Sequence, residues 1–203
     1  MCLIALSDTR FEELSEAFWQ QACAYNRHGF GLMYHDGDGL QIRGHLAYDH
    51  DTVRAESAAV PGGVKAAIHL RNATFGSREE ENLHPQVLTF SEGAFLALAV
   101  MHNGCLPSMH ANRNAGPSDT SLLVHGWLRQ QLQANPAKWC GGEVQRQLAN
   151  IVGPNNRLVL LDSEGNWRRI GAEQGFEVGR TWVSNMKSKA WLTSVLEPQA
   201  ELF

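Results

Sequence analysis

Apolar and polar positions follow two periods along the chain, and the first segments show both. The opening apolar run at 2–6 predicts a short buried strand. Ser7, Asp8 and Thr9 follow it and offer a helix N-cap. Apolar residues then recur at helical spacing, as Phe11, Leu14, Phe18, Ala22 and Tyr25. We therefore expect a helix that starts just after the first strand and ends near residues 26–29.

The later segments predict mostly strands. Runs at 29–35 and 40–46 flank the turn sequence at 36–39 and indicate a hairpin. Strands are expected at 64–71 and 95–101 with a polar loop between them, helices at 118–134 and 142–151, and strands at 157–161, 167–170 and 177–183. Helices packed on antiparallel strands imply an α+β class. We find no internal repeat or linker, so residues 1–203 are expected to form a single domain.

Composition excludes several function classes. Of the 203 residues 43% are hydrophobic and 19% are charged, which suits one substantial core. The net charge of −4 and the lack of a Lys/Arg cluster argue against nucleic acid. The longest apolar stretch, 94–101, is too short to span a bilayer, and the N-terminus has no signal-peptide pattern. We expect no membrane association and a cytoplasmic location.

Cysteine and histidine spacing does not indicate a metal or cofactor. The four cysteines, Cys2, Cys23, Cys105 and Cys140, form no CxxC pair, and reduced thiols are expected. The nine histidines form no HExxH or other ligand-spaced pair. We therefore expect neither a metal nor an organic cofactor.

Cys2 is unusual because only Met1 precedes it. If Met1 is removed, the thiol and the free α-amine lie on one residue, so a nucleophile carries its own base. The α-amine has an ordinary pKa of about 7.7–8.0, which suits a general base near neutral pH. Taken alone, however, a cysteine in an apolar strand is more simply a small buried hydrophobe.

Four polar clusters follow at the ends of apolar runs, where strands give way to loops. They are His-Leu-Arg-Asn-Ala-Thr at 69–74, Asn-Leu-His-Pro at 82–85, His-Asn-Gly at 102–104 and Ser-Asp-Thr at 118–120. With Cys2 and the segment 26–32, they resemble the class II glutamine amidotransferase domain of the N-terminal-nucleophile hydrolase superfamily, in its free-standing small-domain branch. The resemblance runs from residue 2 to about 125, and the tail at 182–185 is consistent with it. It implies a four-layer αββα sandwich with two antiparallel sheets between helical layers.

The resemblance also implies the reacting groups. Cys2 would be the nucleophile and its α-amine the proton shuttle. The Asn103 side-chain amide and the Gly104 N–H would form the oxyanion hole. Without the resemblance, Asn-Gly is most simply a type I′ turn.

Substrate-binding residues are implied in the same way. Arg71 would pair with the α-carboxylate of glutamine, Asp119 would take the α-ammonium, and Thr74 would add a hydrogen bond near the carboxylate. Read alone, Arg71 is a surface ion-pair residue and Asp119 a helix N-cap. We expect His69, His84 and His102 to be structural.

The expected function is hydrolysis of L-glutamine to glutamate by Cys2. Because the chain ends at Phe203, we expect no second catalytic domain and expect ammonia to pass to a separate acceptor synthase. One alternative is a stand-alone amidase for a γ-glutamyl amide, which Phe75 and Gln86 favour because they depart from the family pattern at the pocket mouth. A second alternative is an inactive binding module that keeps only the fold.

Overall fold

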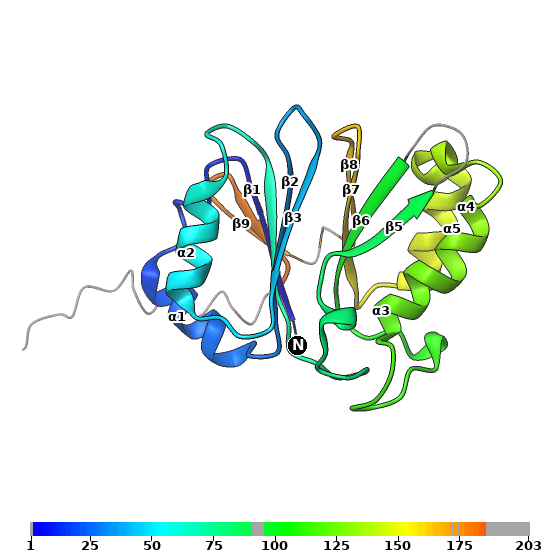
Figure 1. Cartoon of the computed structure of the whole chain (residues 1–203), viewed down its shortest axis with the longest axis horizontal. Helices are drawn as coiled ribbons and strands as arrows, with labels where there is room; N and C mark the ends of the chain where they lie inside the picture. Colours follow the sequence, from blue (N-terminus) through cyan, green and yellow to red (C-terminus); the bar gives the residue numbers. More distant parts are fainter. Residues whose placement is uncertain (1, 91–95, 172, 174, 186–203) are drawn as a thin grey trace, which may run out of the picture.

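The computed structural model describes residues 2–90, 96–171, 173 and 175–185, and it has four layers (Figure 1). Met1 and Phe95, the first residue of one predicted strand, lie outside the described residues. The first sheet has six antiparallel strands in the order β3-β2-β4-β1-β10-β9. Their bounds are β1 Leu3–Ser7, β2 Phe30–His35, β3 Leu40–His45, β4 Ala66–Leu70, β9 Phe176–Val178 and β10 Thr181–Val183.

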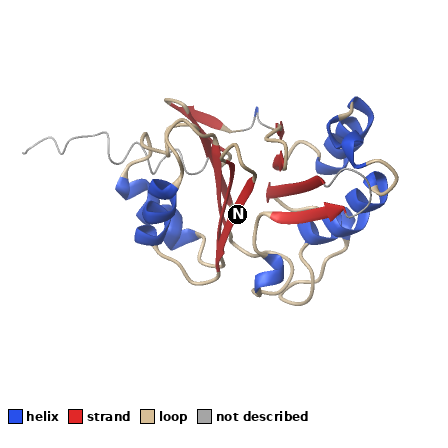
Figure 2. Ribbon diagram, turned by 45° about the horizontal axis from the view of Figure 1, so that its top comes forward, coloured by secondary structure: helices blue, strands red, loops and turns tan. Residues whose placement is uncertain are grey.

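The second sheet has four antiparallel strands in the order β5-β6-β7-β8. Their bounds are β5 Gln86–Phe90, β6 Leu96–Asn103, β7 Arg157–Asp162 and β8 Trp167–Ile170. Helices α1 (Glu16–Tyr25) and α2 (His50–Ala59) cover the outer face of the first sheet, and α3 (Asp119–Ser121), α4 (Arg129–Leu132) and α5 (Gly142–Val152) cover the second (Figure 2). A π-helical stretch, Leu122–Leu128, joins α3 to α4. This architecture confirms the predicted α+β sandwich.

Successive side chains of a strand point to opposite faces of its sheet, so each strand contributes to two layers of the core. In β1, Leu3 and Ala5 pack under the helices of the first layer, whereas Ile4 and Leu6 pack between the two sheets with Met101 of β6. The same period places Cys2 on the face that looks into the space between the sheets. Within the described residues, no helix is long and apolar enough to cross a membrane.

The first helix begins later than the sequence predicts. Ser15, not the Ser7–Thr9 segment, caps α1, and its hydroxyl accepts the Phe18 N–H at 3.2 Å. Arg10 and Phe11 have positive φ, which breaks the helical path between β1 and α1. The predicted 177–183 strand is also divided in two, because Gly179 turns the chain at φ +56°.

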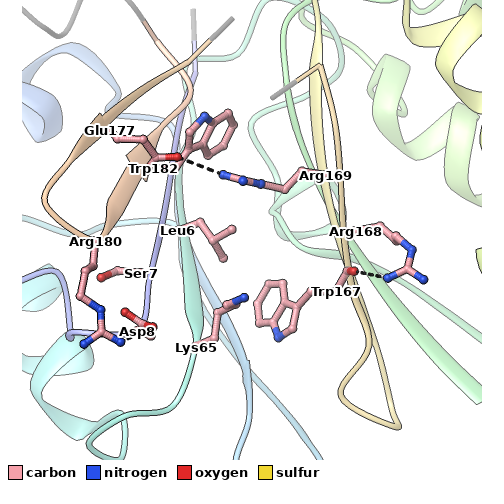
Figure 3. Close-up of a pocket in the computed structure, with 10 residues that line it drawn as sticks. All are labelled: Leu6, Ser7, Asp8, Lys65, Trp167, Arg168, Arg169, Glu177, Arg180 and Trp182. Carbon is pink, nitrogen blue, oxygen red and sulfur yellow. Dashed lines mark hydrogen bonds and ion pairs between the residues drawn. The ribbon is translucent and has the colours of Figure 1, made fainter. Parts of the chain in front are cut away.

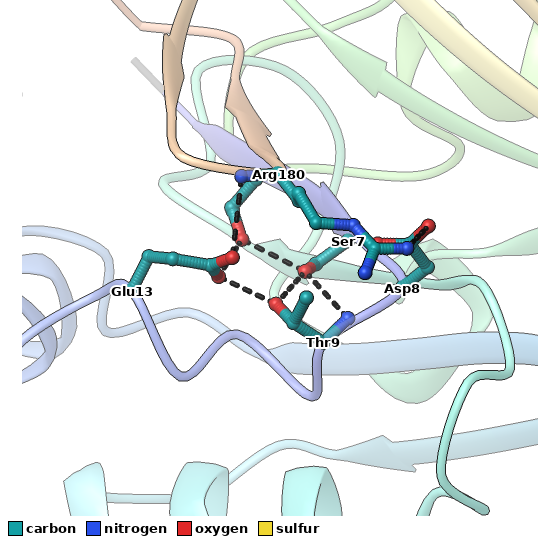
Figure 4. Close-up of polar contacts among 6 residues, drawn as sticks. Ser7, Asp8, Thr9, Glu13 and Arg180 are labelled. Carbon is teal, nitrogen blue, oxygen red and sulfur yellow. Dashed lines mark hydrogen bonds and ion pairs between the residues drawn. The ribbon is translucent and has the colours of Figure 1, made fainter.

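The segment between β1 and α1 forms a hydrogen-bonded clamp on β10 instead (Figure 4). The Glu13 carboxylate accepts from the hydroxyls of Thr9 and Thr181, the latter at 2.7 Å, and from the Arg180 N–H at 3.2 Å. The Thr181 hydroxyl also lies 2.8 Å from that of Ser7. Burial opposes the effect, but these hydrogen bonds lower the pKa of Glu13 to about 2. The clamp thereby fixes β1, the strand that directly follows Cys2, to β10.

Candidate active site

The Cys2 thiol lies just before β1, where β1 meets the end of β4. The Asn72 N–H donates to Sγ at 3.3 Å, and the thiol in turn donates to the Asn72 carbonyl at 3.6 Å. Burial raises the pKa of the thiol, although the Asn72 hydrogen bond and the charge of Arg71 act in the opposite direction. A thiol held protonated in this way needs a neighbouring base before it can attack a carbonyl.

A narrow cavity opens beside this thiol. It encloses about 20 Å³, which is room for about one water molecule. Among its lining residues are Cys2, Arg71, Thr74, Gly104 and Asp119. The structure therefore brings five of the six sequence-predicted site residues to one cavity.

Arg71 is buried rather than a surface ion-pair residue, with 2% of its surface exposed. Its Nη2 donates to the carbonyls of Phe75 at 3.3 Å and Ser77 at 2.8 Å. Its Nη1 is buried and has no hydrogen-bond partner among the described residues. A buried guanidinium with an unused donor is suited to bind a carboxylate that enters the cavity.

Asp119 is not the helix N-cap, because the Ser118 hydroxyl accepts the Ser121 N–H and fills that role. The Asp119 carboxylate instead accepts the Leu106 N–H at 2.7 Å and the Thr120 N–H at 2.8 Å. It thereby holds the loop that follows Gly104. Oδ1 also accepts the Thr120 hydroxyl at 3.4 Å, whereas Oδ2 keeps a second lone pair and can still accept from an ammonium.

Gly104 has a conformation that glycine alone adopts readily, with φ at +145°. A Cβ here would lie 1.9 Å from Oδ1 of Asn156. Asn103 has no positive φ and ends strand β6, so the pair does not form the type I′ turn that Asn-Gly suggests. Both the φ angle and the close approach of Asn156 therefore require glycine at position 104.

The Asn103 side chain is fully buried and does not line the cavity. Its Nδ2 lies 2.8 Å from the Ser184 hydroxyl, and its Oδ1 has no partner among the described residues. The sequence resemblance predicted that Asn103 lies beside Cys2. It gave no signal for the contact of Asn103 with Ser184, which is 81 positions away along the chain.

Three buried histidines lie at the cavity, and two of them, His84 and His102, line it. The rings of His69 and His84 stack with centroids 4.0 Å apart. His69 Nε2 donates to the His102 carbonyl at 3.0 Å, and the His102 N–H donates to Nδ1 of His84 at 3.0 Å. The His102 ring contacts the Thr120 hydroxyl and Oδ1 of Asn156, at 2.8 and 2.9 Å. These bonds join the ends of β4 and β6, and no contact of a histidine with the Cys2 thiol is present among them.

These histidines should make folding sensitive to acid. Burial lowers the pKa of His69 from 6.5 to about 3, and it lowers the pKa values of His84 and His102 as well. Below pH 6.5 the unfolded chain therefore binds protons that the folded chain does not. The contribution of these histidines to the free energy of unfolding is present in full well above pH 6.5 and falls as the pH drops. Each such histidine contributes a slope of about 1.4 kcal/mol per pH unit.

Denaturant unfolding between pH 7 and pH 5 measures this slope. His69→Gln keeps a side-chain donor for the His102 carbonyl but cannot titrate. We expect its free energy of unfolding to fall less steeply with decreasing pH than that of the wild type. The difference in slope should correspond to about one bound proton, or about 1.4 kcal/mol per pH unit. An unchanged slope would show that His69 does not contribute.

The loops around the cavity are held by residues that were not singled out as site residues. Asn82 is fully buried, and its Nδ2 donates to the Ser77 carbonyl at 3.3 Å and the Gly116 carbonyl at 2.9 Å. Its Oδ1 accepts the Ser118 N–H at 2.6 Å. His28 accepts the Ala73 N–H at 2.9 Å. Both residues lie in segments that carried the sequence resemblance, which was the only signal for them.

A second pocket lies between the two sheets, beside strands β8, β9 and β10 (Figure 3). It is larger, at about 360 Å³, and is lined by Trp167, Trp182 and several charged side chains. Arg169 lies over the Trp182 ring at 5.4 Å and pairs with Glu177 at 3.5 Å. No cysteine lines it. This second pocket has the larger volume, but the cavity at Cys2 is the better candidate for an active site because a nucleophile lines it.

Comparisons with known proteins agree with this fold. No protein-family model matches the chain, and no curated protein matches its sequence. The solved structure of glutamine phosphoribosylpyrophosphate amidotransferase from B. subtilis, complexed with ADP and GMP, is similar over 95% of this chain, with a TM-score of 0.53 and 17% identity. A structure described as the allosteric regulatory enzyme of purine biosynthesis is similar over 95% of this chain, with a TM-score of 0.55 and 18% identity.

The chain spans 44% and 43% of the lengths of those two chains. At these identities the likeness shows the fold alone. It confirms that the chain has the αββα fold of the N-terminal-nucleophile hydrolases.

Proposed function

We propose that this chain, which has the N-terminal-nucleophile hydrolase fold, is a glutaminase-type amide hydrolase in which Cys2 attacks the side-chain amide of L-glutamine. The observation that carries the proposal is the placement of the Cys2 thiol in one cavity with the buried cation Arg71 and the carboxylate of Asp119. The cavity thus offers a nucleophile and one group of each charge, which is what a free amino acid with a side-chain amide requires.

The chemistry begins when Met1 is removed and the α-amine of Cys2 is free. The amine takes the thiol proton as Sγ attacks the amide carbon, and it gives that proton to the departing nitrogen, so ammonia leaves and a thioester forms. Water, activated by the same amine, cleaves the thioester to glutamate and restores the thiol. In both steps the carbonyl oxygen becomes negative. The Gly104 N–H, which lines the cavity, would donate a hydrogen bond to it, and the buried Asn103 amide would donate a second once the loop has moved and the site is open to it.

Arg71 and Asp119 would hold the other end of the substrate. The unpartnered Nη1 of Arg71 would donate to the α-carboxylate, and a free lone pair of Asp119 would accept from the α-ammonium. Thr74 is exposed at the cavity and would add a hydrogen bond near the carboxylate. The loop that Arg71 holds through Phe75 and Ser77 must move to admit a substrate, because the cavity is smaller than glutamine.

The small cavity favours glutamine over a bulkier γ-glutamyl conjugate, since the conjugate needs the loop to open further. We propose that the released ammonia passes to a separate acceptor enzyme.

Intact mass measured before and after exposure to a diazo-ketone analogue of glutamine tests the proposal. We expect loss of Met1 and one adduct, with no adduct on Cys2→Ala. Processed protein that gives no adduct, but hydrolyses a γ-glutamyl amide, would favour the conjugate amidase. A retained Met1 would leave the thiol without its base and would favour an inactive binding module.

A further inference from the structure

The Ser184 hydroxyl joins β1, the strand that follows Cys2, to β6, the strand that ends at Asn103. Ser184 directly follows β10 and is fully buried. Its Oγ accepts the Ile4 N–H of β1 at 2.8 Å and lies 2.8 Å from Nδ2 of Asn103 at the end of β6. Ile4 is two residues from Cys2, so one hydroxyl contacts both elements that must meet at the substrate carbonyl.

When Nδ2 of Asn103 faces Ser184, one buried donor and one buried acceptor of this contact are left without a hydrogen bond. A hydroxyl has one proton to donate and two lone pairs, and here both lone pairs would accept N–H groups. Its own proton then has no acceptor among the described residues, and the buried Oδ1 of Asn103 has no donor. Two buried polar groups would be left unsatisfied next to each other.

Exchanging the oxygen and nitrogen of the Asn103 amide gives the Ser184 proton an acceptor and Oδ1 a donor without moving a heavy atom. The Ser184 hydroxyl then donates to Oδ1 and still accepts the Ile4 N–H. The NH₂ group takes the buried position at which the oxygen found no donor. Asn103 shares the face of Met101, which packs between the sheets, so this NH₂ lies in the inter-sheet layer into which Cys2 also faces.

We infer that Ser184 is a positioning residue: its hydroxyl fixes the Asn103 amide with the oxygen toward Ser184 and the NH₂ free to donate to the substrate oxyanion. The inference rests on the proposed function, because it assigns the free donor to amide hydrolysis. It gives a role to the buried Asn103 amide, one atom of which has no partner among the described residues. It also explains how β1 and β6, which lie in different sheets, hold nucleophile and donor at a fixed spacing.

Kinetics of Ser184→Ala test the inference. We expect kcat to fall by between about 10-fold and 10²-fold, the cost of misplacing a catalytic group by about 1 Å. KM should stay within about twofold, because Arg71 and Asp119 hold the substrate and are untouched. Ser184→Thr keeps the hydroxyl and should recover most of the loss. An unchanged kcat in Ser184→Ala would overturn the inference.

A double-mutant cycle with Asn103→Ala separates positioning from a general loosening of β1. If Ser184 acts through Asn103, adding Ser184→Ala to Asn103→Ala should cost no further activity. Full addition of the two losses would overturn the inference. Ser7→Ala is the matched control, because it removes a hydroxyl shared by β1 and the Thr181 side chain without touching Asn103. It should leave kcat near the wild-type value.

Nuclear Overhauser effects of the Asn103 side-chain amide protons give a reading that does not need activity. Weak cross-peaks to the Ser184 β-protons support the inferred orientation, and strong ones, which require Nδ2 beside Ser184, overturn it. If the wild type hydrolyses no amide and takes no adduct, the proposed function fails, and this spectrum still decides the orientation of Asn103.

Discussion

Replacing Cys2 by alanine is expected to abolish amide hydrolysis, with turnover lowered by about 10⁴-fold or more, as when the nucleophile of another covalent hydrolase is removed. The loss should be this large because the residues around the cavity offer no second nucleophile in the place of Sγ, which the Asn72 N–H holds at 3.3 Å. Glutamine binding should persist, since Arg71 and Asp119 remain. Release of ammonia from glutamine measures the first effect, and calorimetric titration with glutamine measures the second.

Cys140→Ala is the matched control. Cys140 is an exposed free cysteine in the helical turn before α5, and its thiol donates only to a local carbonyl. Its replacement should leave turnover unchanged. Retained hydrolysis in the Cys2 variant would contradict the mechanism, and loss of activity in the Cys140 variant would indicate damage unrelated to the nucleophile.

Strong apolar periodicity made most of the fold predictable. Strand β1 is buried along its whole length, and β7 has an apolar run at 158–161, so both are typical of buried strands. The α2 helix was missed because it buries only Val53 and Ser57, and its capping box at Asp49 and Thr52 lies in a polar stretch. Strand β5 was missed because it was included in the polar loop before β6, although Gln86, Leu88 and Phe90 are buried at strand spacing.

The gathering of the candidate residues at one cavity was predictable where they lie in contiguous motifs at strand ends. Arg71 follows β4, which runs antiparallel to β1 and therefore ends beside Cys2. Gly104 follows β6 of the other sheet, and the packing of the two sheets brings it to the same cavity. What could not be predicted are pairings set by tertiary packing. The contact of Ser184 with Asn103 joins two sheets across 81 positions, and the bond of Cys2 to Asn72 uses backbone atoms, which any residue type supplies.

Replacing Arg71 by glutamine is expected to lower kcat/KM for glutamine by on the order of 10²–10³-fold. Removing one member of a buried, hydrogen-bonded charge pair costs about 2–5 kcal/mol, and the substrate carboxylate would lose such a partner. Most of the loss should appear in KM, because the contact is made in the ground state and in the transition state alike. Initial rates over a range of glutamine concentrations measure it.

Arg71 also holds the loop at Phe75 and Ser77, so the loss of the cation must be separated from the loss of the loop. Asn82→Ala is the matched control, because it removes another donor to the Ser77 carbonyl and keeps the guanidinium. A glutamine analogue that lacks the α-carboxylate completes the test. Arg71→Gln should hardly change the rate for this analogue, whereas Asn82→Ala should lower the rates for glutamine and the analogue by similar factors. Equal losses for both substrates in Arg71→Gln would show that Arg71 supports the loop and does not bind a carboxylate.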